Sequence, residues 1–337
     1  MQKVGLAETL HQVGPLKEGI AAGTLKLPAN DTDEMPLPPL YPPPLHPMCA
    51  AEQPAWLQRA AEIDEIKVSY DPARRILWQF MAPQERPSFT PKLIAGMTSL
   101  LNVVDAACEA NPQVPPVAHL VLGSRTRGIF NLGGDLNLFL DAITRGDRGR
   151  LRAYAHNCVK GQHRFATNLG RSLCTIALVQ GDALGGGFEV ALAQQVIVAE
   201  RQARFGLPEV LFNLFPGMGA YSFLSRRINA AEAERMIISG RVYSAEEMHE
   251  MGVVDILAED GQGVNVVHDF VGDYGRTRRT RQATFRARSI VSPIRLDELL
   301  KIADLWVETA LALERSDLRR MRHLATAQSR RCARLQK

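Results

Sequence analysis

The amino-acid sequence predicts an α/β fold in which crossover helices cover a sheet. Short apolar runs typical of buried strands alternate along the chain with longer segments whose apolar residues recur every third or fourth position. Glycine-rich turns stand where strands give way to helices, which is where folds of this class place their ligand sites. A chain of 337 residues predicts one large domain with appendages or two smaller domains.

The first 50 residues differ from the rest of the chain in composition. Residues 35–47 are so rich in proline that helix and sheet interiors are excluded and an extended polyproline II conformation is favoured. We interpret residues 1–50 as an arm or linker. A proline-rich ligand for an aromatic groove on another protein is the alternative.

The globular part begins at Ile63 with two alternating apolar runs that predict a β-hairpin or paired strands. These runs, and the short strands expected after them, lie at 63–70, 76–81, 117–122, 173–179, 196–199 and 253–257. Helical spacing or capping residues predict helices at 91–110, shortly after 136, at 147–169, 188–194, 230–239 and 244–252, and from 292 onward. Asn229 caps the helix that Gly240 ends, and Ser244 with Glu247 forms a capping box.

Composition excludes several classes of protein. Hydrophobic residues make up 46% and charged residues 23%, which is the balance of an ordinary globular protein. No run of about 18 apolar residues indicates a membrane helix and the first ten residues lack a signal-peptide core, so we expect a cytoplasmic protein without a membrane partner. The 40 basic and 36 acidic residues do not indicate a nucleic-acid partner.

Cysteine usage indicates neither a disulfide framework nor a zinc site. The five cysteines are odd in number and far apart, and none forms a Cys-x-x-Cys pair. We expect no metal and no cofactor. The cysteines are Cys49, Cys108, Cys158, Cys174 and Cys332.

Two glycine-bearing turns are candidates for binding an anionic oxygen. The first, at 130–136, follows an apolar strand, and the second, at 180–189, leads from a buried strand into a helix. Glycines let backbone N–H groups face a ligand, and a helix start adds unpaired N–H donors. One donor of this kind is worth about 3–4 kcal/mol to a developing oxyanion. Tight strand-to-helix connections without a ligand remain the alternative.

Other catalytic motifs do not fit. The triple glycine at 185–187 matches neither Gly-x-Gly-x-x-Gly nor a Walker A sequence, no Gly-x-Ser-x-Gly elbow occurs, and His249-Glu250 lacks the second histidine of a zinc protease.

Two glutamates stand in apolar surroundings beside the second turn. Glu189 directly follows the glycines and Phe188, and Glu209 lies in an apolar segment 20 positions later. A carboxylate in such a setting is either a cap or salt-bridge partner, or a group that performs acid–base chemistry.

These residues resemble the crotonase (enoyl-CoA hydratase/isomerase) superfamily over roughly residues 63–257. The resemblance implies a ββα spiral core, catalytic roles for Glu189 and Glu209, and an oxyanion hole formed by the N–H groups of Leu132 and Gly186. It divides the chain into the arm, a catalytic core at 51–260, and a helical C-terminal region at 261–337 that covers the acyl pocket and forms oligomer contacts. Retention of both glutamates implies addition or removal of water.

Within the superfamily the chain looks most like the diffusible signal factor synthases, which make cis-2-unsaturated fatty acids as bacterial quorum-sensing signals. The similar segments lie at 130–136, 206–212, 215–223 and 327–331. The resemblance implies dehydration of a 3-hydroxyacyl group on acyl carrier protein, followed by hydrolysis of the thioester. It also implies a homotrimer or dimer of trimers, and a regulatory sensor-protein partner.

An acyl tail needs an apolar tunnel, for which plain core packing is the alternative. The expected substrate-binding residues are Gly133, Gly185, Leu136, Phe139, Leu214, Met218 and Trp306. Six arginines between 276 and 288 are either a docking site for an acidic carrier protein or a solvated basic face. An ordinary enoyl-CoA hydratase acting on CoA esters, and a non-catalytic interaction protein on the same scaffold, are the other readings of the chain.

Overall fold

The computed structural model describes residues 53–335, and the proline-rich arm predicted at 1–50 lies outside them. A six-stranded sheet has the order β1-β2-β3-β5-β7-β10. Its strands β1 and β2 pair antiparallel and the others pair parallel. These strands are β1 (Ile66–Asp71), β2 (Ile76–Met81), β3 (His119–Ser124), β5 (Cys174–Val179), β7 (Val196–Glu200) and β10 (Ile256–Ala258).

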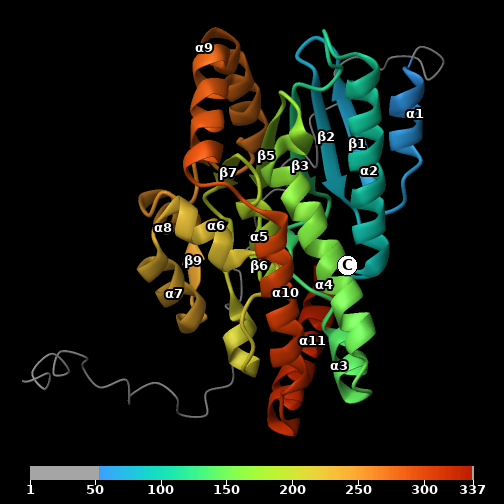
Figure 1. Ribbon diagram of the computed structural model, residues 1–337, viewed down its shortest axis with the longest axis vertical. Helices are drawn as coiled ribbons and strands as arrows, with labels where there is room; N and C mark the ends of the chain where they lie inside the picture. Colours follow the sequence, from blue (N-terminus) through green and yellow to red (C-terminus); the bar gives the residue numbers. More distant parts are fainter. Residues whose placement is uncertain (1–52, 336–337) are drawn as a thin grey trace, which may run out of the picture. The chain divides into compact units, whose positions relative to one another are not determined.

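Alternate residues of this sheet enter two different cores, as expected for strands covered on both faces. Ile76, Trp78 and Phe80 of β2 pack under helix α9 (Gly263–Val291), whereas Leu77 faces the larger core. That larger core is covered by α1 (Ala55–Ala61), α2 (Pro91–Ala110), α4 (Arg148–Ala166) and α5 (Gly186–Leu192). The sheet therefore lies between α9 on one face and α2 and α4 on the other (Figure 1).

A second sheet of short strands, which the sequence did not predict, has the order β4-β6-β8-β9. Its strands are β4 (Ile129–Asn131), β6 (Asp182–Leu184), β8 (Arg204–Gly206) and β9 (Val242–Ser244). Strands β4, β6 and β8 pair parallel. Each of these three strands overlaps one of the segments that the sequence singles out, at 130–136, 180–189 and 206–212, so this small sheet brings those segments together.

The remaining helices surround that edge and form the C-terminal part. They are α3 (Leu136–Thr144), η3 (Asn168–Gly170), η4 (Pro208–Phe212), α6 (Ala220–Arg227), α7 (Ala230–Ser239), α8 (Ala245–Glu250), α10 (Leu296–Leu311) and α11 (Arg315–Leu335). The predicted Asn229 cap and the Ser244–Glu247 capping box are both present. Several bounds differ from the expected ones by up to four residues. The helix expected from residue 292 begins at Leu296, and the strands expected at 63–70 and 253–257 begin at Ile66 and Ile256.

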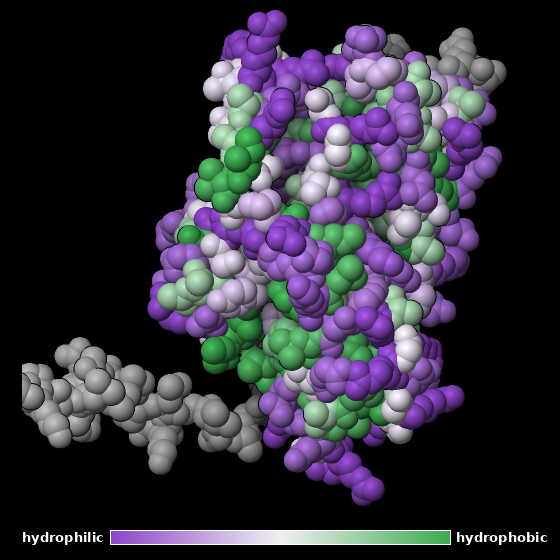
Figure 2. All heavy atoms as spheres, viewed as in Figure 1, coloured by the Kyte–Doolittle hydropathy of each residue, from purple (hydrophilic) through white to green (hydrophobic). Residues whose placement is uncertain are grey.

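Helix α2 is the one helix within residues 53–335 whose length and composition would let it cross a membrane. Leu93, Leu100 and Val104 of this helix are fully buried in the larger core. Its apolar face therefore packs inside the protein in this structure. The face seen in Figure 2 is mainly hydrophilic, with apolar side chains gathered at its upper left and across its lower half.

Candidate active site

The two glycine-bearing turns meet in space. A Cβ placed on Gly133 would lie 3.0 Å from the backbone nitrogen of Gly186, and one on Gly187 would lie 2.1 Å from the carbonyl oxygen of Asn131. Gly133 and Gly185 adopt φ angles of 94° and 52°, which favour glycine. Glycines are therefore required because the backbones of the first turn and of α5 are in contact.

Glu189 lies in the first turn of α5, and its side chain is buried, with 1% of the residue exposed. Its Oε1 accepts hydrogen bonds from the N–H groups of Met218 at 2.8 Å and Ala220 at 2.9 Å. These two donors fix the carboxyl group against the segment that precedes α6. Because these hydrogen bonds hold Oε1, the side chain of Glu189 is kept in one conformation and the position of Oε2 is fixed as well.

Glu209 comes from the 3-10 helix η4, which Pro208 opens. Its Oε1 lies 2.5 Å from the position that a Cβ on Gly185 would occupy. Its Oε2 is buried and has no hydrogen-bond partner among residues 53–335. Glu209 and Glu189 line the same cavity, so the structure brings together the two carboxyl groups that sequence analysis selected.

Burial changes the acidity of both carboxyl groups. It raises the pKa of Glu189 to about 8, with a further contribution from the charge of Glu209, while the Ala220 and Met218 N–H donors oppose the rise. Burial likewise raises the pKa of Glu209 to about 7. A pair in which one member is protonated and the other ionised near neutral pH can donate and accept a proton at the same site.

We expect the pair to lower stability as the pH rises. Both carboxyl groups have a higher pKa in the folded protein than the ordinary value of 4.5, so the folded state binds protons more tightly than the unfolded state. This contribution is most favourable below about pH 4.5 and is lost as the pH rises toward about 8. Thermal unfolding should therefore show a higher Tm for the Glu189→Gln/Glu209→Gln double variant than for the wild type at pH 8, and a smaller difference at pH 5. Equal differences at both pH values would contradict the assigned shifts.

The structure corrects the expected oxyanion hole at one position. The Leu132 N–H donates to the carbonyl oxygen of Pro87 at 2.7 Å, so it is not available to a ligand. Gly134, two residues later, lines the cavity, and its N–H makes no hydrogen bond with any described residue. Gly186 also lines the cavity, and as the first residue of α5 its N–H has no carbonyl one turn earlier in the helix. Gly134 and Gly186 therefore each place a backbone N–H without a partner among residues 53–335 at the cavity.

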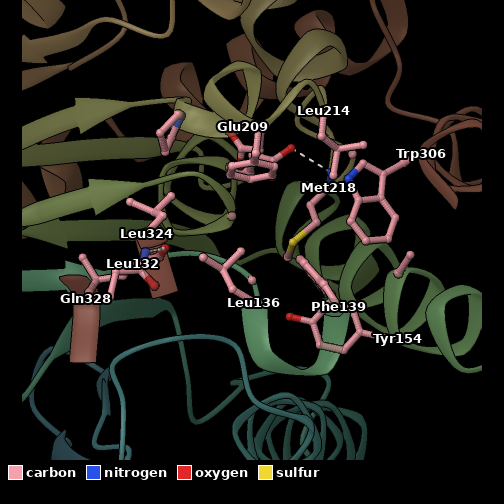
Figure 3. Close-up of a pocket in the computed structure, with 17 residues that line it drawn as sticks. Leu132, Leu136, Phe139, Tyr154, Glu209, Leu214, Met218, Trp306, Leu324 and Gln328 are labelled. Atoms are coloured by element: carbon pink, nitrogen blue, oxygen red, sulfur yellow. Dashed lines mark hydrogen bonds between the residues drawn. The ribbon is translucent and has the colours of Figure 1, made fainter. Parts of the chain in front are cut away.

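Apolar side chains make up most of the cavity wall, which encloses about 560 Å³ of empty space, including its open mouth. The expected residues Leu136, Phe139, Leu214, Met218 and Trp306 all line it, and Figure 3 shows Met218, Phe139 and Trp306 grouped together. Gly133 and Gly185, also expected there, lie behind the wall. Their N–H groups donate to Asn131 Oδ1 and to the carbonyl oxygen of Gly206, both at 2.8 Å.

Two polar side chains at the cavity were not predicted from the sequence. Tyr154 donates from its hydroxyl to the Phe89 carbonyl at 2.6 Å and accepts from the Asp135 N–H at 3.1 Å, which fixes the Gly134 turn. Gln328 of α11 donates to the Leu132 carbonyl at 3.3 Å. In the sequence, Tyr154 looked like part of an apolar helix face, and Gln328 lay in a similar segment without an assigned role.

Comparison with known proteins identifies the family. The family model for enoyl-CoA hydratase/isomerase matches residues 76–266, which is more than half of the chain. The rat mitochondrial methylglutaconyl-CoA hydratase is 30% identical over 166 residues, covering 49% of this chain and 50% of that protein. The mevalonyl-coenzyme A hydratase of Beauveria bassiana is 46% identical over 89 residues, covering 26% of this chain and 32% of that protein. The match thus spans half or less of the length of these relatives.

Solved structures share the fold. The enoyl-CoA hydratase of Bacillus halodurans superposes with a TM-score of 0.63 at 20% identity, covering 77% of this chain and all of that one. Pseudomonas aeruginosa DspI superposes with a TM-score of 0.55 at 23% identity, covering 67% of this chain and 84% of that one. The region matched by the family model, residues 76–266, contains both glycine-bearing turns and both glutamates. The chain therefore belongs to the enoyl-CoA hydratase/isomerase family.

Proposed function

We propose that this chain removes water from a 3-hydroxyacyl thioester and then hydrolyses the thioester, releasing a cis-2-unsaturated fatty acid of the kind used as a quorum-sensing signal. The observation that carries the proposal is the placement of Glu189 and Glu209 in one buried cavity beside two unpaired backbone donors. General acid–base catalysis needs both an ionised and a protonated group within reach of the substrate. The raised pKa values of this pair supply them near neutral pH.

In the dehydration step, the thioester carbonyl oxygen accepts hydrogen bonds from the Gly134 and Gly186 N–H groups. The ionised carboxylate of the pair takes the α-proton, and the electron pair moves to the carbonyl oxygen as an enolate. The protonated carboxyl group then gives its proton to the 3-hydroxyl, which leaves as water while the C2–C3 double bond forms. The two backbone donors stabilise the enolate because they already point to where the charge develops.

Hydrolysis uses the same groups. A carboxylate of the pair takes a proton from a water molecule, whose oxygen attacks the thioester carbon and forms a tetrahedral oxyanion held by the same backbone N–H groups. Collapse breaks the carbon–sulfur bond, and the thiolate takes the proton from the carboxyl group. The products are a free enoic acid and the carrier thiol.

One feature favours a synthase of this kind over an ordinary hydratase, and a second fits an acyl substrate in either case. The segments at 130–136, 206–212 and 215–223, which resemble the signal synthases, provide Gly134, Glu209 and Met218 of the cavity. The cavity wall is apolar and closed by Trp306 and Leu324 from the C-terminal helices, which suits a fatty-acyl tail. The second candidate is a hydratase of CoA esters, favoured by the names of the curated relatives.

Product analysis separates the two candidates. Mass spectrometry of fatty acids from cells expressing the chain should detect a free cis-2-enoic acid that is missing with the Glu189→Gln/Glu209→Gln variant. Only trans-enoyl or 3-hydroxyacyl thioesters, with no free enoic acid, would instead establish the hydratase.

An acyl carrier protein is the proposed carrier, with the arginines of α9 as its docking surface. Arg279 and Arg286 are exposed there, and neither forms an ion pair within residues 53–335. Exposed charges interact with an acidic partner in a way that salt screens. We expect kcat/KM for the carrier-bound substrate to fall steeply between low and physiological salt, and the fall to be shallower in the Arg279→Gln/Arg286→Gln variant. The neutral N-acetylcysteamine thioester is the control, and an equal salt effect on both substrates would contradict docking at α9.

The remaining proposals rest on the resemblance alone. They are assembly as a trimer or pair of trimers, a regulatory sensor-protein partner and a cytoplasmic location. Analytical ultracentrifugation of the full chain measures the first of these directly.

A further inference from the structure

A second cavity adjoins the catalytic one on the other side of Met218. It holds about 340 Å³ of empty space, including its open mouth, and its wall is formed by α2, α4 and α5 with Phe89 and Met218. Most of the wall is apolar, including Ile94, Met97 and Leu101 of α2, Phe165 of α4 and Val190 of α5. Met218 lines both cavities, so its side chain is the partition between them.

One buried polar side chain of this second cavity lacks a partner. Gln162 of α4 lines the cavity with only 2% of the residue exposed. Neither its Oε1 nor its Nε2 makes a hydrogen bond with any described residue. A Cβ on Gly219 would lie 3.3 Å from Gln162 Oε1, which places the amide beside the same turn that carries Met218. A buried amide without a partner destabilises the protein unless something binds to it.

The chemistry of the wall limits what that partner is. An amide both donates and accepts, so it matches a neutral group that does the same, such as a hydroxyl or another amide. No Lys, Arg or His is among the residues that line this cavity, which disfavours a carboxylate or a phosphate. Two other polar residues line the cavity: Thr98, whose hydroxyl donates to the Ile94 carbonyl at 2.8 Å, and the exposed Asn157. The rest of the wall is apolar or glycine, which favours a group attached to a hydrocarbon chain.

The Met218 side chain between the two cavities can change conformation to admit such a chain. The Met218 backbone is fixed, because its N–H donates to Glu189 at 2.8 Å, but its thioether is unbranched and adapts to its surroundings. A Cβ on Gly186 would lie 2.8 Å from Met218 Sδ, so this sulfur is next to one of the two residues whose N–H groups are proposed to hold the thioester carbonyl.

We propose that the second cavity is a substrate subsite in which the Gln162 amide binds a neutral hydrogen-bonding group carried on an apolar chain of the thioester. The inference rests on the proposed thioester chemistry. Two parts of the substrate carry such a group: an acyl chain with a second hydroxyl, and the pantetheine arm with its amides. The apolar wall favours the acyl chain.

Gln162→Met tests the subsite, because methionine has a similar shape and no hydrogen-bonding amide. The substrates are 3-hydroxydodecanoyl-CoA and a panel of analogues with a second hydroxyl at successive carbons of the distal half. We expect the wild type to prefer one analogue over the parent by about tenfold in kcat/KM, and Gln162→Met to lose that preference. If pantetheine is the source, Gln162→Met lowers kcat/KM equally for the whole panel and leaves the S-ethyl thioester of 3-hydroxydodecanoic acid unchanged. No change for any of these substrates overturns the proposal.

Gly161 offers an independent test, because a Cβ there would meet nothing within 4 Å and the residue lines the second cavity. Gly161→Leu should lower kcat/KM for 3-hydroxydodecanoyl-CoA at least about tenfold relative to Gly161→Ala. If the acyl chain occupies the cavity, both variants should turn over 3-hydroxybutyryl-CoA at the same rate. If pantetheine occupies it, Gly161→Leu should lower kcat/KM for both substrates. Unchanged turnover of both substrates by a folded Gly161→Leu protein overturns the subsite. Absence of turnover of every thioester by the wild type would instead refute the proposed function.

Discussion

Replacing either Glu189 or Glu209 by glutamine should lower kcat for dehydration by about 10²–10⁴. Glutamine keeps the size of the side chain, and at position 189 its Oε1 still accepts the Met218 and Ala220 N–H groups, so the fold is retained. What is lost is the group that carries or takes the proton. Steady-state rates with a purified 3-hydroxyacyl thioester, together with the Tm of each variant, measure the effect.

Glu200 provides the matched control for these variants. It is fully buried like Glu189, but its Oε1 accepts from Gln180 and the Gly263 N–H, and it does not line the cavity. Glu200→Gln should leave kcat within about twofold of the wild type, since it removes no group from the reaction. Near-normal turnover by both Glu189→Gln and Glu209→Gln would refute the acid–base scheme.

The second large effect concerns the Gly134 N–H. Gly134→Pro removes this hydrogen. The φ angle of Gly134 is not in the left-handed region, which would exclude proline. A single lost oxyanion donor typically lowers kcat about 10²–10³-fold.

A side chain at position 134 has a cost of its own, which must be separated from loss of the donor. A Cβ there would lie 2.5 Å from Phe139 Cζ. We therefore compare Gly134→Pro with Gly134→Ala, both in a Phe139→Leu background that removes the ring. The expected ratio of kcat between them is about 10²–10³ in favour of alanine. Equal rates for two folded proteins would mean that the Gly134 N–H does not hold the carbonyl oxygen.

Elements with strong local signals could be predicted from the sequence. The helix at 91–110 was predicted with its observed bounds, because Thr90 and Pro91 begin it and its apolar residues face the core. The helix at 230–239 likewise has its cap at Asn229 and its end at Gly240. The strands of the second sheet were missed, since three residues are too few for a period of two to be visible. Helix α1 at 55–61 was also missed, because no capping side chain marks its start.

The site could be predicted in its residue types but not in its hydrogen bonds. Glu189 and Glu209 were found because carboxylates are out of place in apolar segments. The direction of a backbone N–H depends on which carbonyl lies next to it, and the partner of Leu132 is Pro87, 45 residues earlier in the chain. The sequence around 130–136 therefore indicated an oxyanion turn, while only the structure showed that Gly134 is its free donor.

Deuterium incorporation during hydration of cis-2-butenoyl-CoA in D₂O, the reverse of the proposed dehydration, measures the proton transfers that the account assigns to the two glutamates. The wild type should form 3-hydroxybutyryl-CoA carrying one deuterium at the α-carbon, detected by mass spectrometry. The Glu189→Gln/Glu209→Gln variant should form neither the hydroxyl nor the labelled α-carbon. Hydration and labelling by that double variant at the wild-type rate would contradict the account.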